Sequence, residues 1–223
     1  MWGVLPVKNF ANAKTRLAPA LSPDERRALF RLMVEDVLAA LCASSLAGVL
    51  VLTNEPKAIA LARRYGARVE GEPENLGQSE AVARAMGILE AEGVTAALQL
   101  PGDIPGVTPA EIDTLVRAHT AAAAPRAMTI VQAHDFRGSN ALAVSPPSLI
   151  PFHFGHDSFQ PHLAEARAIG VEPRILTGLP GIALDIDTAE DLAKLLARQD
   201  VSTRATAWAR EHGLGERLAA RPA

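Results

Sequence analysis

Three aspartates follow apolar segments in which a buried strand is expected to end. Asp103 comes after the run TAALQL and the dipeptide Pro-Gly, in the segment LPGDIPGVTPAE. Asp185 and Asp187 lie two positions apart in IALDID, so on a strand their side chains point to the same face. Three carboxylates that meet at one edge of a sheet repel each other unless a cation neutralises them. Oxygen ligands without cysteine or a histidine pair favour Mg²⁺ or Mn²⁺ over zinc.

Each of these aspartates also has an alternative role. Asp103 can begin a turn, and Asp187 can lie in a loop that leads to a helix cap at Thr188. These roles do not explain why all three carboxylates follow segments that end at the same edge of an α/β sheet. We therefore predict that Asp103, Asp185 and Asp187 hold Mg²⁺ (or Mn²⁺) together.

Three cationic side chains follow the first apolar run, in the segment PVKNFANAKTRLAP. Lys8, Lys14 and Arg16 lie within nine positions, and in an α/β fold this first loop faces a bound triphosphate. Lysine acts on a phosphate as a point charge, whereas the arginine fork binds two oxygens. The segment contains neither G-x-x-x-x-G-K nor G-x-G-x-x-G, which excludes the two common glycine-rich phosphate loops. A solvated basic loop is the alternative interpretation.

Short apolar runs that alternate with helical patterns must position these groups. Continuous Val, Leu and Ile runs are typical of parallel strands covered on both faces. We expect strands at 3–7, 48–53, 67–70, 95–100, 127–133, 140–144 and 182–186. The alternation predicts an α/β fold with an open, mostly parallel sheet, which binds its ligand beyond the carboxyl ends of the strands.

Helix starts are marked by cap patterns. SPDE at Ser22 and TPAE at Thr108 place a hydroxyl before a proline and a glutamate, and TAED at Thr188 follows the same pattern more loosely. We expect helices at 23–44, 56–65, 78–92, from 109 onward, at 160–168 and at 189–199.

The composition is that of one globular domain with a short appendage. The chain has 223 residues, of which 48% are hydrophobic and 21% charged, and its formal net charge is -3. This balance argues against nucleic acid and membrane surfaces as partners. Without a signal-peptide pattern or a run of roughly 20 apolar residues, we expect a cytoplasmic location. We predict one domain at 1–199 and an arginine-rich tail at 200–223, compatible with a short helix, to which we assign no chemistry.

Five segments match, in order and spacing, the motifs of a known family. They are PVKNFANAKTRLAP, LPGDIPGVTP, FRGSNALAVSPP, FHFGHDSFQPHLAEARAIG and LDIDTAEDL. Together they span residues 3–199 and resemble the CofC/FbiD guanylyltransferases, which belong to the MobA-like nucleotidyltransferases. The resemblance implies a GT-A-like fold, a single Rossmann-like domain with a central mixed, mostly parallel sheet flanked by helices.

For the activity, the resemblance implies transfer of GMP from GTP to a small phosphorylated acid in coenzyme F420 biosynthesis, with release of pyrophosphate. The acid is 2-phospho-L-lactate in archaeal members, phosphoenolpyruvate in many bacterial ones and 3-phosphoglycerate in some relatives. A bacterial composition favours phosphoenolpyruvate. Ser139 stands where the family usually has the threonine of GGTNAL, and Arg137 replaces the first glycine, so the other two acids stay open.

The resemblance also implies roles for individual residues. The metal ligands would be Asp103, Asp185 and Asp187. The carboxylate of the acid would be held by Ser139, Gly155 and Ser158. The segment GEPENLGQSEAV resembles a nucleotide-binding loop, in which Pro73, Asn75 and Gly77 would lie against the base or ribose. A polar turn before a helix is the alternative for this loop.

The implied reaction needs no general base, because the second pKa of a phosphate monoester is about 6 and its oxygen is already ionised at neutral pH. The difficulty is the approach of two anions. Cations and metal ions would neutralise the phosphate oxygens, keep attack in line on the α-phosphorus and stabilise the leaving pyrophosphate. The residues with these catalytic roles would be Lys8, Lys14, Arg16 and Asp103.

Several alternatives remain at this point. His153, His156 and His162 have a spacing compatible with a zinc site, although supporting or surface roles are favoured. A related nucleotidyltransferase would use a molybdopterin or sugar phosphate as acceptor, but the glycine-rich LAGG start typical of those enzymes is absent. A non-catalytic nucleotide-binding module has the same fold, and the intact set of aspartates argues against it. The oligomeric state is open, a homodimer included.

Overall fold

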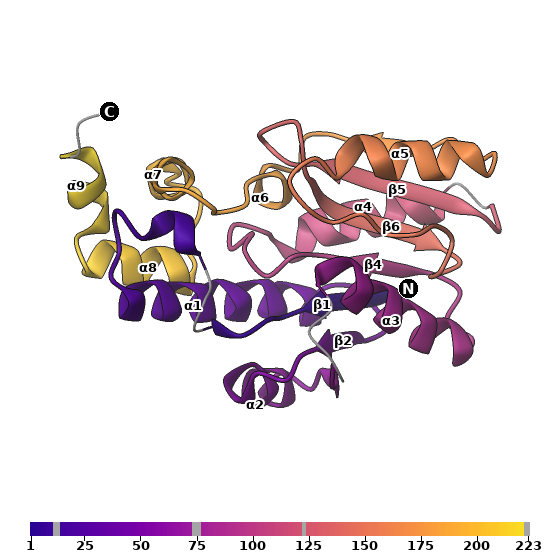
Figure 1. Ribbon diagram of the computed structural model, residues 1–223, viewed down its shortest axis with the longest axis horizontal. Coiled ribbons are helices and arrows are strands. Elements are labelled where there is room, and N and C mark those ends of the chain that lie inside the picture. Colours follow the sequence, from indigo (N-terminus) through magenta and orange to yellow (C-terminus); the bar gives the residue numbers. More distant parts are fainter. Residues whose placement is uncertain (11–13, 73–76, 122–123, 221–223) are drawn as a thin grey trace.

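One mixed sheet forms the centre of the molecule (Figure 1). The computed structural model describes residues 1–10, 14–72, 77–121 and 124–220. Within these residues the strands are β1 (Trp2–Pro6), β2 (Val49–Leu52), β3 (Arg68–Glu70), β4 (Ala97–Gln99), β5 (Ala127–Gln132), β6 (Ser139–Ser145) and β7 (Arg174–Leu176). Their order in the sheet is β3-β2-β1-β4-β6-β5-β7. In this described set β6 runs antiparallel to β4 and β5, and the other pairs are parallel.

Three of the described helices begin where the cap patterns at Ser22, Thr108 and Thr188 predict. The helices are α1 (Pro23–Cys42), α2 (Pro56–Arg64), α3 (Gln78–Ala91), α4 (Pro109–Thr120), α5 (Phe159–Ala168), α6 (Pro180–Ala183), α7 (Ala189–Ala197), α8 (Arg204–Glu211) and α9 (Leu214–Ala219) in the described part of the chain. The side chains of Ser22, Thr108 and Thr188 each accept a hydrogen bond from the backbone N–H of the third helical residue. The side chain of that third residue accepts in return from the N–H of the cap residue. These reciprocal bonds satisfy two backbone donors at each helix start.

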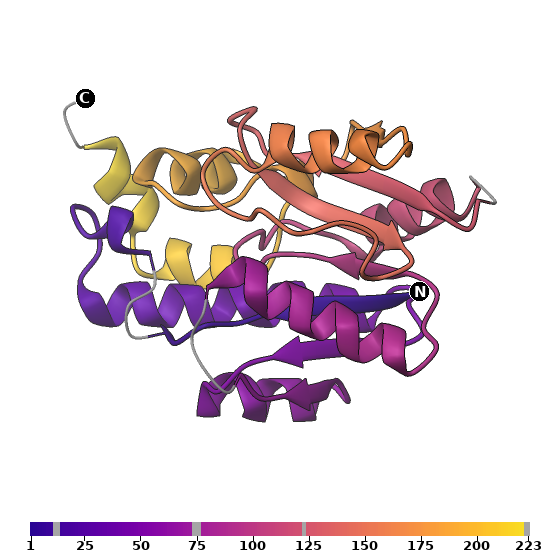
Figure 2. The same cartoon turned by 45° about the vertical axis from the view of Figure 1, so that its right-hand side comes forward.

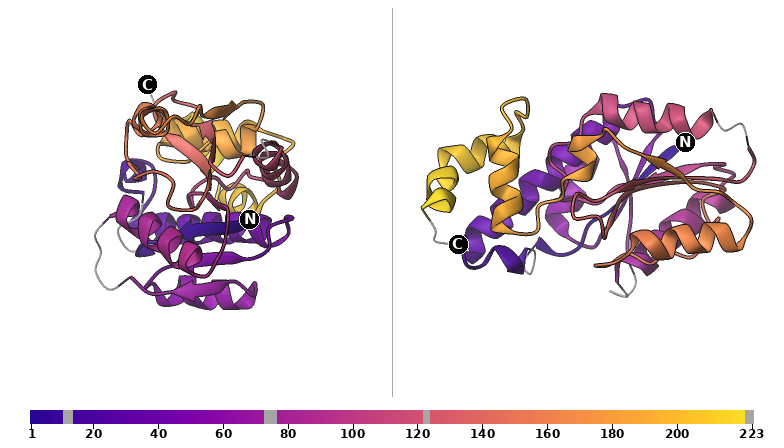
Figure 3. Two further views of the ribbon diagram at one scale, coloured as in Figure 1. Left: turned by 90° about the vertical axis from the view of Figure 1, so that its right-hand side faces the viewer. Right: turned by 90° about the horizontal axis from the view of Figure 1, so that it is seen from above.

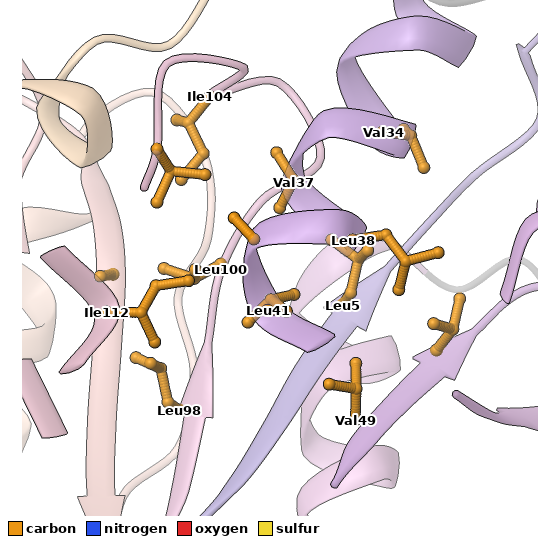
Figure 4. Close-up of a cluster of buried hydrophobic side chains, with 14 of the residues drawn as sticks. Leu5, Val34, Val37, Leu38, Leu41, Val49, Leu98, Leu100, Ile104 and Ile112 are labelled. Carbon is orange, nitrogen blue, oxygen red and sulfur yellow. The ribbon is translucent and has the colours of Figure 1, made fainter. Parts of the chain in front are cut away.

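Helices cover both faces of the sheet because strand residues alternate in direction. Leu5 belongs to a buried cluster with α1, α2 and α4, whereas the preceding Val4 belongs to a second cluster with α3 and α5. Figure 4 shows Val37 and Leu41 of α1 within the first cluster, above β1 and β4. Figure 3 shows α4 and α5 on opposite sides of the sheet.

The strand expected at 182–186 is wrong. The segment begins inside the short helix α6, which ends at Ala183, and continues with residues outside the sheet. The outer edge of β5 is already paired with β7, so no edge of β5 is free for a further strand. The missed strand β7 has half-exposed residues at the sheet edge, and its sequence therefore lacks a continuous apolar run.

The C-terminal residues form two helices that pack on the rest of the molecule (Figure 2). Ala205, Ala209 and Leu214 of α8 and α9 are buried in a third core cluster with α1, α7 and the 3-10 helix η2 (Thr15–Leu17). Asp36 of α1 accepts hydrogen bonds from the first two N–H groups of α8. The segment from 200 onward thus supports η2, which lies directly beside Lys14. No described helix combines the length and the apolar character that crossing a membrane requires.

Candidate active site

A cavity of about 640 Å³ lies at the edge of the sheet where β4 and β5 end and β6 begins. A volume of this size is typical of sites for small molecules, and this edge is where an α/β sheet binds its ligand. The sequence-predicted residues that line it are Arg16, Asp103, Ser139, Gly155, Ser158, Asp185 and Asp187. Segments from distant parts of the chain therefore meet here, as the motif analysis anticipated.

Lys14 lies between two of the predicted carboxylates. Its Nζ is 2.5 Å from Asp103 Oδ2 and 2.7 Å from Asp187 Oδ1, and its side chain is only 6% exposed. Its backbone is in the left-handed region, with φ of 56°, a conformation that costs a residue with a side chain about 1–2 kcal/mol. Arg16 Nη1 lies 3.5 Å from the other oxygen of Asp187. The cation that neutralises these carboxylates in the structure is thus a lysine of the first loop.

The three aspartates have different electrostatic environments. Burial acts to raise the pKa of Asp187, but the charge and hydrogen bond of Lys14 outweigh it and hold that pKa below its usual value. Burial raises the pKa of Asp185, and the charges of Asp103 and Asp187 act in the same direction. Burial alone would lower the pKa of Lys14, whereas the two carboxylates raise it above its ordinary value. Of Asp185 and Asp187, Asp185 therefore has the higher pKa relative to its usual value, because no cation among the described residues lowers it.

Backbone contacts join the segment of Asp103 to the segment of Asp185 and Asp187. The N–H of Ile186 donates to the carbonyl of Asp103 at 2.9 Å. Glu111, which completes the cap of α4, also accepts from the N–H of Gly181 at 2.7 Å. A Cβ at position 181 would lie 2.2 Å from the carbonyl oxygen of Gly106. This close backbone approach requires glycine and fixes the distance between the two carboxylate-bearing segments.

Two residues that the sequence analysis did not single out lie beside Asp185, and one of them, Asn140, is hydrogen-bonded to it. Asn140 Nδ2 donates to Asp185 Oδ1 and to the carbonyl of Ala183, each at 2.9 Å. His134 Nε2 lies 2.9 Å from Asp191 Oδ1, and its Nδ1 lies 3.5 Å from Asp185 Oδ1. Asn140 follows Ser139 directly in the FRGSNAL segment, a signal that could have found it. His134 carries no such signal, because only folding brings the end of β5 to this segment.

A second part of the cavity wall, here called the neutral end, is built from the uncharged side chains of Ser139 and Ser158. The N–H of Ser139 donates to Ser158 Oγ at 2.9 Å, and Ser139 Oγ lies 3.0 Å from His162 Nδ1. The N–H of His153 donates to His162 Nε2 at 3.0 Å. Gly155 lies between these segments on the cavity wall. These contacts join the start of β6 to the start of α5.

The loop around Gly155 is held from two further sides. Ser79 Oγ, near the start of α3, accepts from the N–H of Phe154 at 2.8 Å. Arg137 forms a two-pronged ion pair with Asp157, with Nε–Oδ1 and Nη2–Oδ2 distances of 2.6 and 3.0 Å. Both side chains of that pair are at least half exposed, so it contributes little to stability. Arg137, the departure from the family pattern, thus contacts the loop that carries two predicted substrate-binding residues.

Lys8 does not line the larger cavity. Lys8 lines a separate cavity of about 150 Å³ with Asn54 and Glu72, which follow β2 and β3. Pro73 and Asn75 lie outside the described residues. Gly77 precedes α3 with φ of 106°, a left-handed conformation that favours glycine, and Gln78 lines the larger cavity.

Neither the predicted aspartate site nor the histidine spacing compatible with zinc forms a preassembled metal site in the described residues. In the residues with described positions, no three His, Cys, Asp or Glu side chains already surround a point where an ion could sit. His153 pairs with Glu165, His162 bonds to Ser139, and His156 lines the cavity. The three histidine side chains therefore do not converge on one point.

Solved structures identify the class of fold. A putative nucleotide-diphospho-sugar transferase from Desulfovibrio desulfuricans G20 superposes with a TM-score of 0.76 at 18% identity, over 97% of both chains. Glucosyl-3-phosphoglycerate synthase from Mycobacterium tuberculosis, solved with Mn²⁺, UDP and phosphoglyceric acid, gives a TM-score of 0.54 at 15% identity, over 91% of this chain and 79% of that one. The protein has the GT-A-like α/β fold of these nucleotide-dependent transferases, which confirms the predicted fold class.

The chain belongs to the family of CofC-like guanylyl transferases, whose model matches residues 1–215. A phosphoenolpyruvate guanylyltransferase of Conexibacter woesei is 37% identical over 219 residues, which are 97% of this chain and 96% of that protein. A 2-phospho-L-lactate guanylyltransferase of Methanothermobacter thermautotrophicus is 32% identical over 193 residues, 86% of this chain and 82% of that protein. The family expected from the five segments is confirmed, and with it the assignment to the nucleotidyltransferases.

Proposed function

We propose that this protein transfers GMP from GTP to phosphoenolpyruvate, releases pyrophosphate, and acts in coenzyme F420 biosynthesis. The observation that carries the proposal is one cavity whose wall combines three carboxylates, two of which contact Lys14 (the charged end), with the hydroxyls of Ser139 and Ser158 (the neutral end). The relatives named for phosphoenolpyruvate and for 2-phospho-L-lactate support a phosphorylated carboxylic acid as acceptor. A cytoplasmic location fits this proposal, because GTP and such acids are cytoplasmic metabolites.

The two ends of the cavity suit the two ends of such an acid. A carboxylate accepts hydrogen bonds, and Ser139 and Ser158 supply hydroxyls that line the cavity. A phosphate needs cations, and Lys14 and Arg16 lie at the other end. A hydroxyl binds an anion without adding charge, so the acid would be oriented by the distribution of charge along the cavity.

A divalent metal fits the residues at the charged end. The side chains of Asp103, Asp185 and Asp187 offer only oxygen ligands, the donor set of Mg²⁺ or Mn²⁺. Lys14 Nζ already contacts two of them, so the location suits a cation. In this proposal these aspartates hold the metal, which when bound supplies charge neutralisation and orientation of phosphate oxygens. The Mn²⁺ in the glucosyl-3-phosphoglycerate synthase structure supports a divalent ion without fixing which one.

The side chains of the chain itself have simple tasks in this reaction. The acceptor phosphate is already ionised at neutral pH, so none of them has to remove a proton from it. Lys14 and Arg16 neutralise the triphosphate and the leaving pyrophosphate. Asn140 keeps the Asp185 carboxylate in one orientation. The barrier that these groups lower is electrostatic, the approach of one anion to another.

The guanosine of GTP is proposed to lie on the β1 to β3 side of the cavity. Lys8, Asn54 and Glu72 form a small cavity there, and Gly77 leads into α3 beside Gln78. Pro73 and Asn75 are proposed, from the sequence alone, to contact the same guanosine. Backbone amides of a glycine-containing loop allow a ribose or base to approach closely.

The test is a pyrophosphate-release assay with the purified protein, GTP and Mg²⁺. Phosphoenolpyruvate, 2-phospho-L-lactate and 3-phosphoglycerate are supplied separately, and the guanylylated product is identified by mass. We expect release with phosphoenolpyruvate at the highest kcat/KM. Replacement of GTP by ATP, CTP or UTP serves as the control for the nucleotide, and addition of EDTA as the control for the metal. Release with none of the three acids would contradict the proposal.

A further inference from the structure

His162 is the most buried polar side chain near the neutral end of the cavity. Its exposed fraction is 0%, and it lies on α5 below Ser139 and Ser158. Neither the family resemblance nor the proposed chemistry gives it a task. Its two ring nitrogens have different partners, and those partners fix which nitrogen carries the proton.

The N–H of His153 determines the tautomer. A backbone N–H can only donate, and it points at His162 Nε2 over 3.0 Å. Nε2 must therefore be the unprotonated, accepting nitrogen, and in a neutral ring the proton lies on Nδ1. Burial, together with the charge of His153, lowers the pKa of His162 to about 4, so the ring is neutral at pH 7.

The tautomer in turn determines the direction of the Ser139 hydroxyl. His162 Nδ1 lies 3.0 Å from Ser139 Oγ, and a protonated Nδ1 makes this oxygen the acceptor. The hydroxyl proton of Ser139 must then point elsewhere, and the side chain lines the cavity. Ser158 has the same arrangement, because its Oγ accepts from the N–H of Ser139 at 2.9 Å. Among the described residues, neither hydroxyl has an acceptor of its own within hydrogen-bond distance.

We propose that His162 is a positioning residue for the acid: by donating its Nδ1 proton to Ser139 Oγ, it directs the Ser139 hydroxyl proton into the cavity as a donor to the substrate carboxylate. With the reverse tautomer, Ser139 would donate to the ring and present lone pairs to an anion. The inference rests on the proposed function. It implies that the cavity prefers a hydrogen-bond acceptor, such as a carboxylate, beside Ser139.

Two variants separate this role from a structural one. In His162→Asn the side-chain amide takes the place of Nδ1 and can donate to Ser139, while the bond from His153 is lost. In His162→Gln the amide oxygen reaches the place of Nε2 and keeps the bond from His153, while the donor to Ser139 is lost. Each variant removes one of the two ring hydrogen bonds, so we expect both variants to lose a similar amount of stability.

The readouts are KM for phosphoenolpyruvate, KM for GTP and kcat. A hydrogen bond to a charged group is worth enough to change an affinity about 10-fold or more, so we expect His162→Gln to raise KM for the acid by this factor. We expect His162→Asn to remain close to the unmodified protein, and KM for GTP to change in neither variant. Equal losses in both variants, or an equal rise of both KM values, would overturn the proposal.

A double substitution tests whether His162 acts through Ser139. In a Ser139→Ala background the hydroxyl is absent, so His162→Gln should add no further increase in KM for the acid. Additive increases would overturn the role of this contact.

The tautomer is measured without any substrate. The ¹⁵N chemical shifts of the histidine rings in the ligand-free protein should show His162 protonated at Nδ1, with the assignment taken from whichever of the two His162 variants folds. A proton on Nε2 overturns the proposal even if a variant fails to fold. Absence of pyrophosphate release from the unmodified protein with every acid would instead contradict the proposed function, so the two failures are distinguishable.

Discussion

The two ends of the cavity achieve order in opposite ways. At the charged end, Asp103 and Asp187 remain partly exposed and share one ammonium group, that of Lys14. At the neutral end, Ser139, Ser158 and His162 are 6%, 2% and 0% exposed, and hydrogen bonds between them fix their orientation.

This difference indicates a division of work. In the proposed function, ions and phosphates would exchange at the charged end, where a metal ion would replace the Lys14 ammonium between the same carboxylates. The neutral end is organised before the substrate binds, because its donors are directed by buried partners. Substitutions at the charged end should therefore change turnover, and substitutions at the neutral end should change recognition of the acid.

The largest effect is expected from Asp103→Asn. Loss of this carboxylate removes one proposed metal ligand and one partner of Lys14, and several kcal/mol of charge stabilisation correspond to a fall in kcat of at least about 100-fold. The unfolding temperature should change little. The control is Asp113→Asn on α4, an aspartate outside the cavity lining whose Oδ1 accepts from the N–H of Ser45, which should leave kcat unchanged. Equal activity of both variants would show that turnover does not require the carboxylate of Asp103.

A second substitution separates binding of the metal from turnover. In Lys14→Ala the ammonium that competes for Asp103 and Asp187 is gone, so Mn²⁺ should bind more tightly, as measured by electron paramagnetic resonance. Turnover should fall by about 10-fold to 100-fold, since a cation for the triphosphate is lost. The control is Lys57→Ala, which changes an exposed lysine of α2. Weaker Mn²⁺ binding would show that Lys14 supports the ion rather than competing with it.

A third substitution moves the charged end while the serines and His162 keep their contacts. In Gly181→Ala the new Cβ would meet the carbonyl of Gly106, and such overpacking costs about 1–3 kcal/mol of unfolding free energy. Turnover should fall more than KM for the acid rises. Gly87→Ala, inside α3 with nothing within 4 Å of the added Cβ, should instead increase stability slightly. A Gly181→Ala protein as stable as the Gly87→Ala protein would argue against the close approach of these segments.

The smallest effect concerns pH and buried histidines. Burial and the charge of Arg174 lower the pKa of His119 to about 4, from 6.5. Between these values the unfolded chain binds more protons, so the free energy of unfolding decreases as the pH falls. From pH 7 to pH 6 the decrease is at most about 0.7 kcal/mol for one such histidine. His119→Gln should reduce this slope in urea unfolding at several pH values; an unchanged slope would show that His119 has the same pKa in the folded and unfolded chain.

The sequence predicted the elements that carry strong local signals. The cap patterns at Ser22, Thr108 and Thr188 located three helix starts, since the hydroxyl and the third residue interact within one turn. The strand expected at 182–186 failed, because an apolar run does not reveal whether a sheet edge is free. The edge strand β7 was missed for the converse reason, since its residues are exposed.

The candidate site shows the same limit. Asp103, Asp185 and Asp187 were found through their segments, and all three line one cavity. The partners of these groups were not found, because His134 and Asn140 contact Asp185 across 40 or more positions. Their contacts depend on how β5 and β6 lie beside α6, which no local pattern encodes.

What the sequence determined by itself is the inventory of chemical groups and the family to which the chain belongs, because residue types and motif order are properties of the chain alone. The tertiary structure decided that Lys14 lies between two carboxylates, that Lys8 lines a different cavity, and that His162 lies beneath Ser139. Those outcomes depend on distances of a few ångströms between segments far apart in the chain, and packing of the whole fold sets such distances.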